Sequence, residues 1–444
     1  MSRTGMTSEK GGKPMSDMLL DARTAQAKPA PRAAIVSADG TPLKQALMRA
    51  TRRARWRAFA FVAPLGLFIL LTFAFPIGQM LWLSVYNPTF SDSMPRTTAY
   101  FAANAALGVP DEAAFEALAL DVKDAQASRE LGQVGTRINY SVPGANSLFK
   151  KTARGVAKIE AGPYKDQLIA IDEEWATPAM WDSMRRASSS LTGDFYLAAV
   201  DLMRDDTGSI VHMPAEQSIY VMLFIRTLWL SAAIAAICLV LGFPVAYLLA
   251  ILPMRTSNLL MVLVLLPFWT ALLVRTTAWL VLLQGQGVLN NIMVALGILS
   301  EDGRIEMIYN RTGTIIAMVH ILLPFMILPL YSVMKTIKPH YMRAAISMGA
   351  TPAHAFRKVY IPQTIPGVGA GTLLVFILAI GYYITPALVG GASGQLISNT
   401  IAFHMLSSLN WSLAAALGAI LLAGVMLLYW LYDRLVGIDN MKLG

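Results

Sequence analysis

Residues 338–366, KPHYMRAAISMGATPAHAFRKVYIPQTIP, lie between two apolar runs that are each long enough to cross a membrane. Pro339 can begin a helix, because a first-turn residue needs no N–H partner. Gly349 stands where a helix C-terminus favours a left-handed residue, and Thr351-Pro352 suits an N-cap and a new first turn. Ile361-Pro362 is expected to end the second helix. The pattern predicts two short helices joined by a glycine turn on a basic membrane face.

The composition on either side of this stretch is that of a polytopic membrane protein. Of 444 residues, 55% are hydrophobic and 14% are charged, whereas soluble domains are about one quarter charged. The net charge of +9 is uneven: residues 1–57 hold 12 Lys and Arg against 4 Asp and Glu, and residues 88–218 hold 12 against 18. We interpret the basic parts as cytoplasmic and membrane-facing, not as a nucleic-acid site.

Six apolar runs predict six membrane-spanning helices and place both termini in the cytoplasm. The runs cover residues 59–86, 219–252, 259–283, 313–335, 367–391 and 410–432. The predicted organisation is a disordered basic cytoplasmic tail (1–57), transmembrane helix 1 (58–87), an external periplasmic insert (88–218), transmembrane helices 2–6 with a cytoplasmic loop at 338–366 (219–434), and a short cytoplasmic tail (435–444).

The insert is expected to form a small, mostly helical domain. The segments beginning at Asp111, Thr177 and Asp194 favour helices, whereas residues 134–145 are ambiguous. The insert is either a structural embellishment or a docking surface for another protein.

No catalytic or metal-binding constellation is visible in the sequence. Cys238 is the single cysteine, and the five histidines show no ligand spacing, so no metal site is predicted. For His320, inside an apolar run, a buried hydrogen-bonded role is favoured. The sequence has no G-x-x-x-x-G-K-[ST] run, so ATP binding by a P-loop is not expected in this chain.

Several residues inside the spans are candidates for a translocation path. Arg275 lies deep in an apolar run, where a charge is costly unless it is paired or wetted, so it either snorkels or pairs within the bundle or lines the path. Tyr382, Tyr383 and Pro386 interrupt another span, and broken backbone at membrane depth must be buried or line a cavity. Trp269 could bind a cationic solute through its ring face, or could belong to an interfacial aromatic belt.

Residues 338–366 resemble the EAA loop of the membrane subunits of binding-protein-dependent ABC importers. Ala344 and Ala345 match the motif, Gly349 has the expected spacing, and the motif closes with Val359, Ile361 and Pro362. Arg343 stands where the family usually has Glu. The resemblance implies that the loop is a coupling helix that inserts into a groove on a cytoplasmic ATPase subunit.

Four further stretches extend the resemblance to the first permease subunit of spermidine/putrescine-type importers. These are LGFPVAYLLA (241–250), LPFWTALLVRTTAW (266–279), YYITPALVGG (382–391) and NWSLAAALG (410–418). The implied fold is an all-α polytopic membrane protein with six transmembrane helices of the ABC importer permease (methionine-importer-like) type, carrying the insert between helices 1 and 2.

The resemblance also implies a function and a set of partners. The chain would be a non-enzymatic permease subunit in a bacterial inner membrane. It would work with two copies of an ATPase that binds ATP and Mg, a second permease subunit and an external binding protein. A polyamine is the favoured solute, and another small organic solute or ferric iron is the alternative. A secondary transporter or channel without an ATPase is the alternative from a different class, but it predicts inward-facing acidic residues or paired broken helices, and neither is evident.

Overall fold

A computed structural model describes residues 43–436 apart from 105 and 206–207. The chain divides after Pro76 into two compact units, and each is described by itself. The expectations for residues 1–42 and 437–444 lie outside the described residues. Within the described residues, six helices are long and apolar enough to cross a membrane, and the structure is almost wholly helical.

The first unit contains helix α2 (Leu43–Ile69), a π turn η1 (Leu70–Ala74) and the start of α3 (Phe75–Leu83). The tail predicted to be disordered through residue 57 is therefore helical from Leu43, because Ala, Leu, Lys and Arg in this segment are all strong helix formers. The candidate membrane span begins at Ala54.

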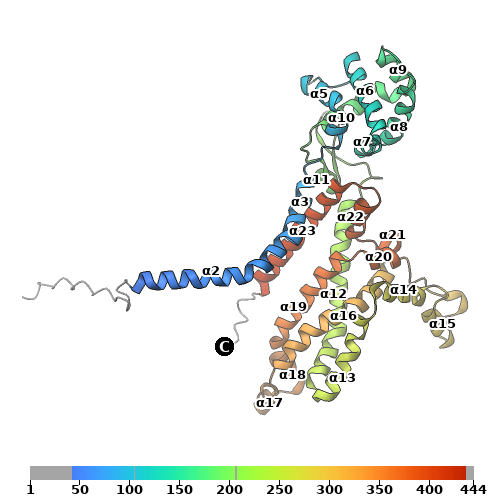
Figure 1. The fold of residues 1–444 in the computed structure, drawn as a ribbon. Coiled ribbons are helices and arrows are strands. Elements are labelled where there is room, and N and C mark those ends of the chain that lie inside the picture. Colours follow the sequence, from blue (N-terminus) through green and yellow to red (C-terminus); the bar gives the residue numbers. More distant parts are fainter. Residues whose placement is uncertain (1–42, 105, 206–207, 437–444) are drawn as a thin grey trace, which may run out of the picture. The chain divides into compact units, whose positions relative to one another are not determined.

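The insert folds as a cluster of helices (Figure 1), and the cluster has its own aromatic core. Trp175 and Trp181 are fully buried, with ring centroids 5.9 Å apart, and their indole N–H groups donate to Thr152 Oγ1 and to the Trp175 carbonyl at 2.8 Å each. The cluster comprises α4 (Thr89–Ser93), α5 (Pro95–Ala103), α6 (Glu112–Ala127), α7 (Leu131–Asn139), α8 (Ala145–Val156), α9 (Tyr164–Ile171), η2 (Glu173–Ala176) and α10 (Pro178–Ser188).

The C-terminal part of the insert departs from the sequence expectation. The helix predicted from Asp194 ends early, as α11 (Asp194–Ala199), because Asp201 adopts a left-handed φ of 59°. A two-stranded antiparallel sheet follows, β1 (Leu202–Arg204) and β2 (Ile210–His212), with Met203 opposite Val211.

Three long helices pack side by side as the core of the membrane region (Figure 1). They are α12 (Tyr220–Ile251), α16 (Arg311–Thr336) and α19 (Ile361–Gly381). Small residues let the helices approach closely: a Cβ on Gly371 would lie 2.8 Å from the Met326 sulfur. The last long helix is α23 (Trp411–Val436).

Two predicted boundaries in the membrane region are wrong. The run 259–283 is not one helix: α13 (Met254–Leu265) and a 3-10 turn η3 (Leu266–Trp269) are separated from α14 (Leu272–Leu283) by extended backbone at Thr270 and Ala271. Pro267 lacks the N–H that a continuous helix would need. The following loop contains α15 (Val288–Ala295) and a 3-10 turn η4 (Glu301–Gly303).

The second wrong boundary is at Pro362, which does not end a helix. A continuous helical segment runs through α18 (Pro352–Ala355), a π turn η5 (Phe356–Tyr360) and α19. The wider π turn accommodates the proline ring, which would otherwise clash with the carbonyl four residues earlier. Beyond the predicted break at Tyr382 lie α20 (Ile384–Val389), α21 (Gly391–Gly394) and α22 (Ile397–Leu406), the last of which was not predicted.

Candidate functional site

The loop 338–366 contains the glycine turn that the sequence predicts. Helix α17 (His340–Ser347) ends at Gly349, whose φ is +94°. The Ala350 N–H donates to the Ala345 carbonyl at 3.1 Å and the Gly349 N–H donates to the Ile346 carbonyl at 2.9 Å. This pair of bonds is a Schellman motif, which requires a left-handed residue at the position of Gly349.

After the turn, helix α18 begins with a defined N-cap, and aromatic side chains attach the loop to the membrane region. Thr351 caps α18 by accepting from the His354 N–H at 3.3 Å. Phe356 stacks on Tyr360 with ring centroids 5.3 Å apart, and both rings meet the edge of Tyr247 on α12 at 5.4 and 5.2 Å. This aromatic trio fixes the loop to the end of α12.

The motif residues divide into a buried face and an exposed face. Ala345 is 7% exposed, whereas Arg343, Ala344, Gly349 and Pro362 are exposed. Val359 is half-buried and Ile361 is 37% exposed. Three large apolar side chains beside the motif are also exposed: Tyr341, Ile346 and Met348. Exposed apolar groups surrounded by basic ones form a surface suited to a protein partner.

Arg275 is explained by the break in the third apolar run. Its Nη2 donates to the Thr270 carbonyl at 3.0 Å, and its Nε lies 3.4 Å from Thr270 Oγ1. The guanidinium therefore satisfies a carbonyl that the interrupted helix leaves without an intrahelical partner. Arg275 also lies close enough to Tyr382 and His320 to interact electrostatically with both.

The break at Tyr382 and Tyr383 is held by α22. Ser398 Oγ donates to the Tyr382 carbonyl at 2.6 Å, and Asn399 Nδ2 donates to the Tyr383 carbonyl at 2.7 Å. Pro386 is buried and Tyr383 is 41% exposed. Arg275 on α14 thus lies near Tyr382, at the break between α19 and α20.

Trp269 stands apart from this group. It ends the 3-10 turn before the break and is 77% exposed. A second tryptophan, Trp279 on α14, is paired with His320: its indole N–H donates to His320 Nδ1 at 3.0 Å. The structure shows the hydrogen-bonded role predicted for His320. Its partner, Trp279, lies 41 residues away in the chain, so the sequence spacing could not identify it.

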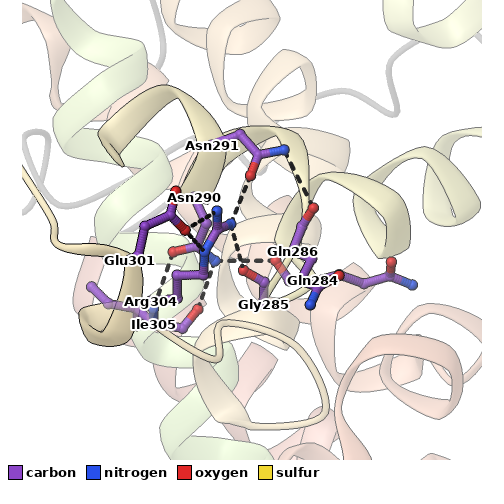
Figure 2. Close-up of polar contacts among 8 residues, drawn as sticks. All are labelled: Gln284, Gly285, Gln286, Asn290, Asn291, Glu301, Arg304 and Ile305. Atoms are coloured by element: carbon purple, nitrogen blue, oxygen red, sulfur yellow. Dashed lines mark hydrogen bonds and ion pairs between the residues drawn. The ribbon is translucent and has the colours of Figure 1, made fainter. Parts of the chain in front are cut away.

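A polar cluster stabilises the loop between α14 and α16 (Figure 2). The buried Asn290 amide donates to the Gln284 and Ile305 carbonyls at 3.1 and 2.9 Å and accepts from the Ile305 N–H at 3.0 Å. Arg304 bonds Glu301 at 2.8 Å and Asn291 at 2.6 Å. Figure 2 shows these side chains pointing toward one another, so their bonds are used within the loop, which indicates a structural role.

The insert is bonded directly to the first turn of α12. Asp201, 5% exposed, accepts from the Tyr220 N–H at 2.9 Å and from the Val221 N–H at 2.8 Å. A carboxylate at a helix N-terminus satisfies orphan N–H groups and interacts favourably with the helix dipole. Asp201 belongs to the insert, so α12 carries the insert at one end and the aromatic trio at the other.

These features define a multi-pass α-helical membrane protein with a structured loop that exposes apolar side chains. Residues 239–437 match the family model described as binding-protein-dependent transport system inner membrane component. The chain belongs to this family: it is a permease subunit of an ABC importer, a transport component and not an enzyme, and it acts with a binding protein and an ATPase.

Two named relatives, both PotB proteins, agree with this assignment. The spermidine/putrescine transport system permease protein PotB of Escherichia coli (strain K12) is 37% identical over 221 residues, which cover 49% of this chain and 80% of the relative. PotB of Salmonella typhimurium (strain LT2) is 38% identical over 202 residues, which cover 45% and 70%. A solved bacterial alginate ABC transporter in complex with a pentasaccharide-bound periplasmic protein is 15% identical with a TM-score of 0.42, covering 51% of this chain and 80% of that chain.

Proposed function

We propose that this permease imports a polyamine of the spermidine/putrescine class. The observation that carries the proposal is the 37% identity to PotB over 80% of that relative. The chain contains no Asp or Glu between Glu216 and Glu301 or between Glu306 and Asp433. A cationic solute crossing it would therefore meet aromatic faces and backbone carbonyls, as at Tyr382 and Tyr383, while the binding protein selects it.

The test is uptake by the reconstituted importer. The chain is placed in proteoliposomes with its ATPase, second permease and binding protein, and ATP-dependent uptake of labelled spermidine and putrescine is measured. Saturable uptake that an excess of unlabelled polyamine abolishes is expected. Uptake of ferric iron or of another organic solute, without polyamine uptake, would refute the polyamine assignment and keep the importer class.

We propose that loop 338–366 is the surface that engages the ATPase. Support comes from the exposed Tyr341, Ile346 and Met348, from the adjacent Arg343, and from the aromatic trio that joins the loop to α12. Because the Arg343 side chain is exposed, it is free to contact acidic groups of a partner without altering the fold. ATP and Mg are bound by that partner, and the assembly contains two ATPase copies and a second permease.

The proposed orientation has both termini and the loop in the cytoplasm and the insert in the periplasm. The single cysteine, Cys238, is fully buried, so the native chain has a low background for thiol labelling. Glu160→Cys in the insert and His354→Cys in the loop both introduce thiols at exposed positions. In intact cells with a permeable outer membrane, an impermeant maleimide should label the first variant and spare the second. The reverse labelling pattern would show that the topology is the inverse of the one proposed.

We propose that the insert docks the binding protein. It is acidic, with 18 Asp and Glu against 12 Lys and Arg, it has its own core, and it exposes Leu107, Leu191 and Ile210. Replacing it with a short linker between Asn87 and Ser218 should preserve membrane insertion and weaken transport at limiting binding protein. ATPase activity is measured against binding-protein concentration in both forms, and superimposable curves would rule out docking.

A further inference from the structure

The base of the insert contains two cavities that share one wall. One, of about 380 Å³, lies between the C-terminal part of the insert and the start of α12, and the other, of about 670 Å³, lies between α7 and the segment before α23. Arg137, Tyr140 and Asn410 line both. We call these three residues and the two cavities the basal pocket. Its walls include residues of α7, α11 and α23.

Arg137 is a buried cation that forms no ion pair within 4 Å among the described residues, although the charge of Asp194 acts on it. It is 6% exposed, its Nε is buried without a hydrogen-bond partner, and no ion pair to it forms among the described residues. Its guanidinium carbon lies 4.8 Å from the centroid of Phe195. The carboxylate of Asp194, which interacts electrostatically with Arg137, forms its ion pair with Arg204 Nε at 3.3 Å. Burial lowers the pKa of Arg137, yet an arginine remains charged at neutral pH.

Asn410 places a second donor at the same wall. Its Oδ1 accepts from the Leu413 N–H at 3.1 Å, so the capping bond fixes which end of the amide is the donor. Its Nδ2 is buried and meets the geometric criteria for a hydrogen bond with no described residue, although the amide is close enough to the Tyr140 hydroxyl to interact with it. The third shared residue is Tyr140, whose pKa is raised by burial, with a smaller opposite effect of Ser408 and Asn410, so its hydroxyl is neutral and can also donate.

The charge of the lining points to the chemistry of the ligand. Among the residues that the structure describes, four arginines, 129, 137, 186 and 204, line the two cavities together with one acid, Asp194, although the insert as a whole is acidic. A buried charge and a buried amide left unpaired each carry a desolvation penalty, which an acceptor-rich ligand would remove. The rest of the smaller cavity is largely apolar, with Phe195, Leu197 and Leu413 in its wall.

We propose that the basal pocket binds a small organic carboxylate with an apolar body. The carboxylate would accept from Arg137 and Asn410, and the apolar body would pack against the Phe195 side of the pocket. Such a ligand is opposite in charge to a polyamine, so the pocket would not bind the solute proposed above for transport. Because Tyr220 also lines the pocket, an occupant would contact the insert, α12 and the start of α23 together, and would stabilise their arrangement.

The test uses three probes that share a phenyl ring and differ in charge: phenylacetate, 2-phenylethanol and phenethylamine. Binding to the full chain in lipid nanodiscs is measured by equilibrium dialysis and by the shift of the thermal unfolding midpoint. Phenylacetate should bind and raise the midpoint, whereas the alcohol and the amine should bind about tenfold more weakly or worse, because they cannot accept two charge-assisted bonds. Equal binding of all three, or an absence of phenylacetate binding, would overturn the proposal.

Two variants separate a ligand site from a structural role. Arg137→Met should weaken phenylacetate binding about tenfold or more and should raise the unfolding midpoint of the ligand-free protein, because it removes an unpaired buried charge. Asn410→Asp keeps the acceptor for the Leu413 N–H and puts a carboxylate in the pocket, so it should also block binding. Arg154→Gln, on an exposed part of α8, should change neither property. A fall in ligand-free stability of Arg137→Met, or unchanged binding by either variant, would overturn the assignment.

Discussion

Replacement of Gly349 tests the coupling loop through backbone conformation alone. The residue has a φ of +94°, and no atom lies within 4 Å of the position that a Cβ would take. A side chain there therefore meets no clash with its surroundings. Its whole effect comes from the left-handed conformation that the two bonds of the Schellman motif require.

The expected magnitude follows from that conformation. An L-residue other than Gly costs about 1–2 kcal/mol in the left-handed region, with Asn at the low end and a β-branched residue above Ala. A cost of that size shifts a local equilibrium about 5- to 30-fold away from the native turn. The order of retained coupling should be Gly, Asn, Ala and Val, and the aromatic trio should keep the rest of the loop attached.

The assay is ATPase stimulation by the binding protein, together with solute uptake, for Gly349→Asn, Gly349→Ala and Gly349→Val. Membrane insertion is measured in parallel and should stay close to that of the parent. Gly193→Ala is the matched control, because Gly193 has a φ of −98° and equally open surroundings.

Two results would contradict the reasoning. Full coupling in Gly349→Val would show that the glycine turn does not position the loop for the ATPase. A loss of insertion in the same variant would show that the turn is needed for folding, and that reduced transport does not report on coupling.

Three further predictions concern other parts of the chain. Asp201→Asn should destabilise the N-terminus of α12 by about 1–2 kcal/mol, because it removes a buried negative charge that interacts favourably with the helix dipole. The unfolding midpoint is compared with that of the exposed control Asp166→Asn, and equal midpoints would contradict the prediction. Trp279→Phe should cost about 1 kcal/mol, because His320 Nδ1 loses its donor, and an unchanged midpoint would show that the bond contributes nothing. Deletion of residues 1–42 should leave insertion and assembly intact in a membrane-fraction assay, and failed assembly would refute it.

Much of the membrane fold follows from apolar run length, because each run of about 20 residues must satisfy its backbone internally as a helix. The turn at Gly349 was equally predictable, since one residue type strongly prefers that conformation. The break at Tyr382 was visible for a similar reason, because the surrounding run contains Pro386 and paired glycines.

Proline positions misled the prediction in two places because a proline's effect depends on its neighbours. Pro362 follows a π turn that makes room for its ring, so the helix continues, whereas extended backbone follows Pro267 and the helix stops. Arg275 could not be interpreted before that break was known, because the carbonyl it satisfies exists only at the break. Asn410 and Arg137 lie far apart in the chain, so their meeting at one wall required the fold.

Helix α12 has a mechanical consequence for how the two ends of this subunit communicate. It is a continuous helix of 32 residues, or about 48 Å. The carboxylate of Asp201 in the insert is bonded to its first turn, and the aromatic trio packs near its last turn. A tilt of about ten degrees would move one end by roughly 8 Å relative to the other at that helix rise. Strain applied to the insert can therefore reach the loop as rigid-body rotation of a single element, without any relay of side-chain rearrangements between them.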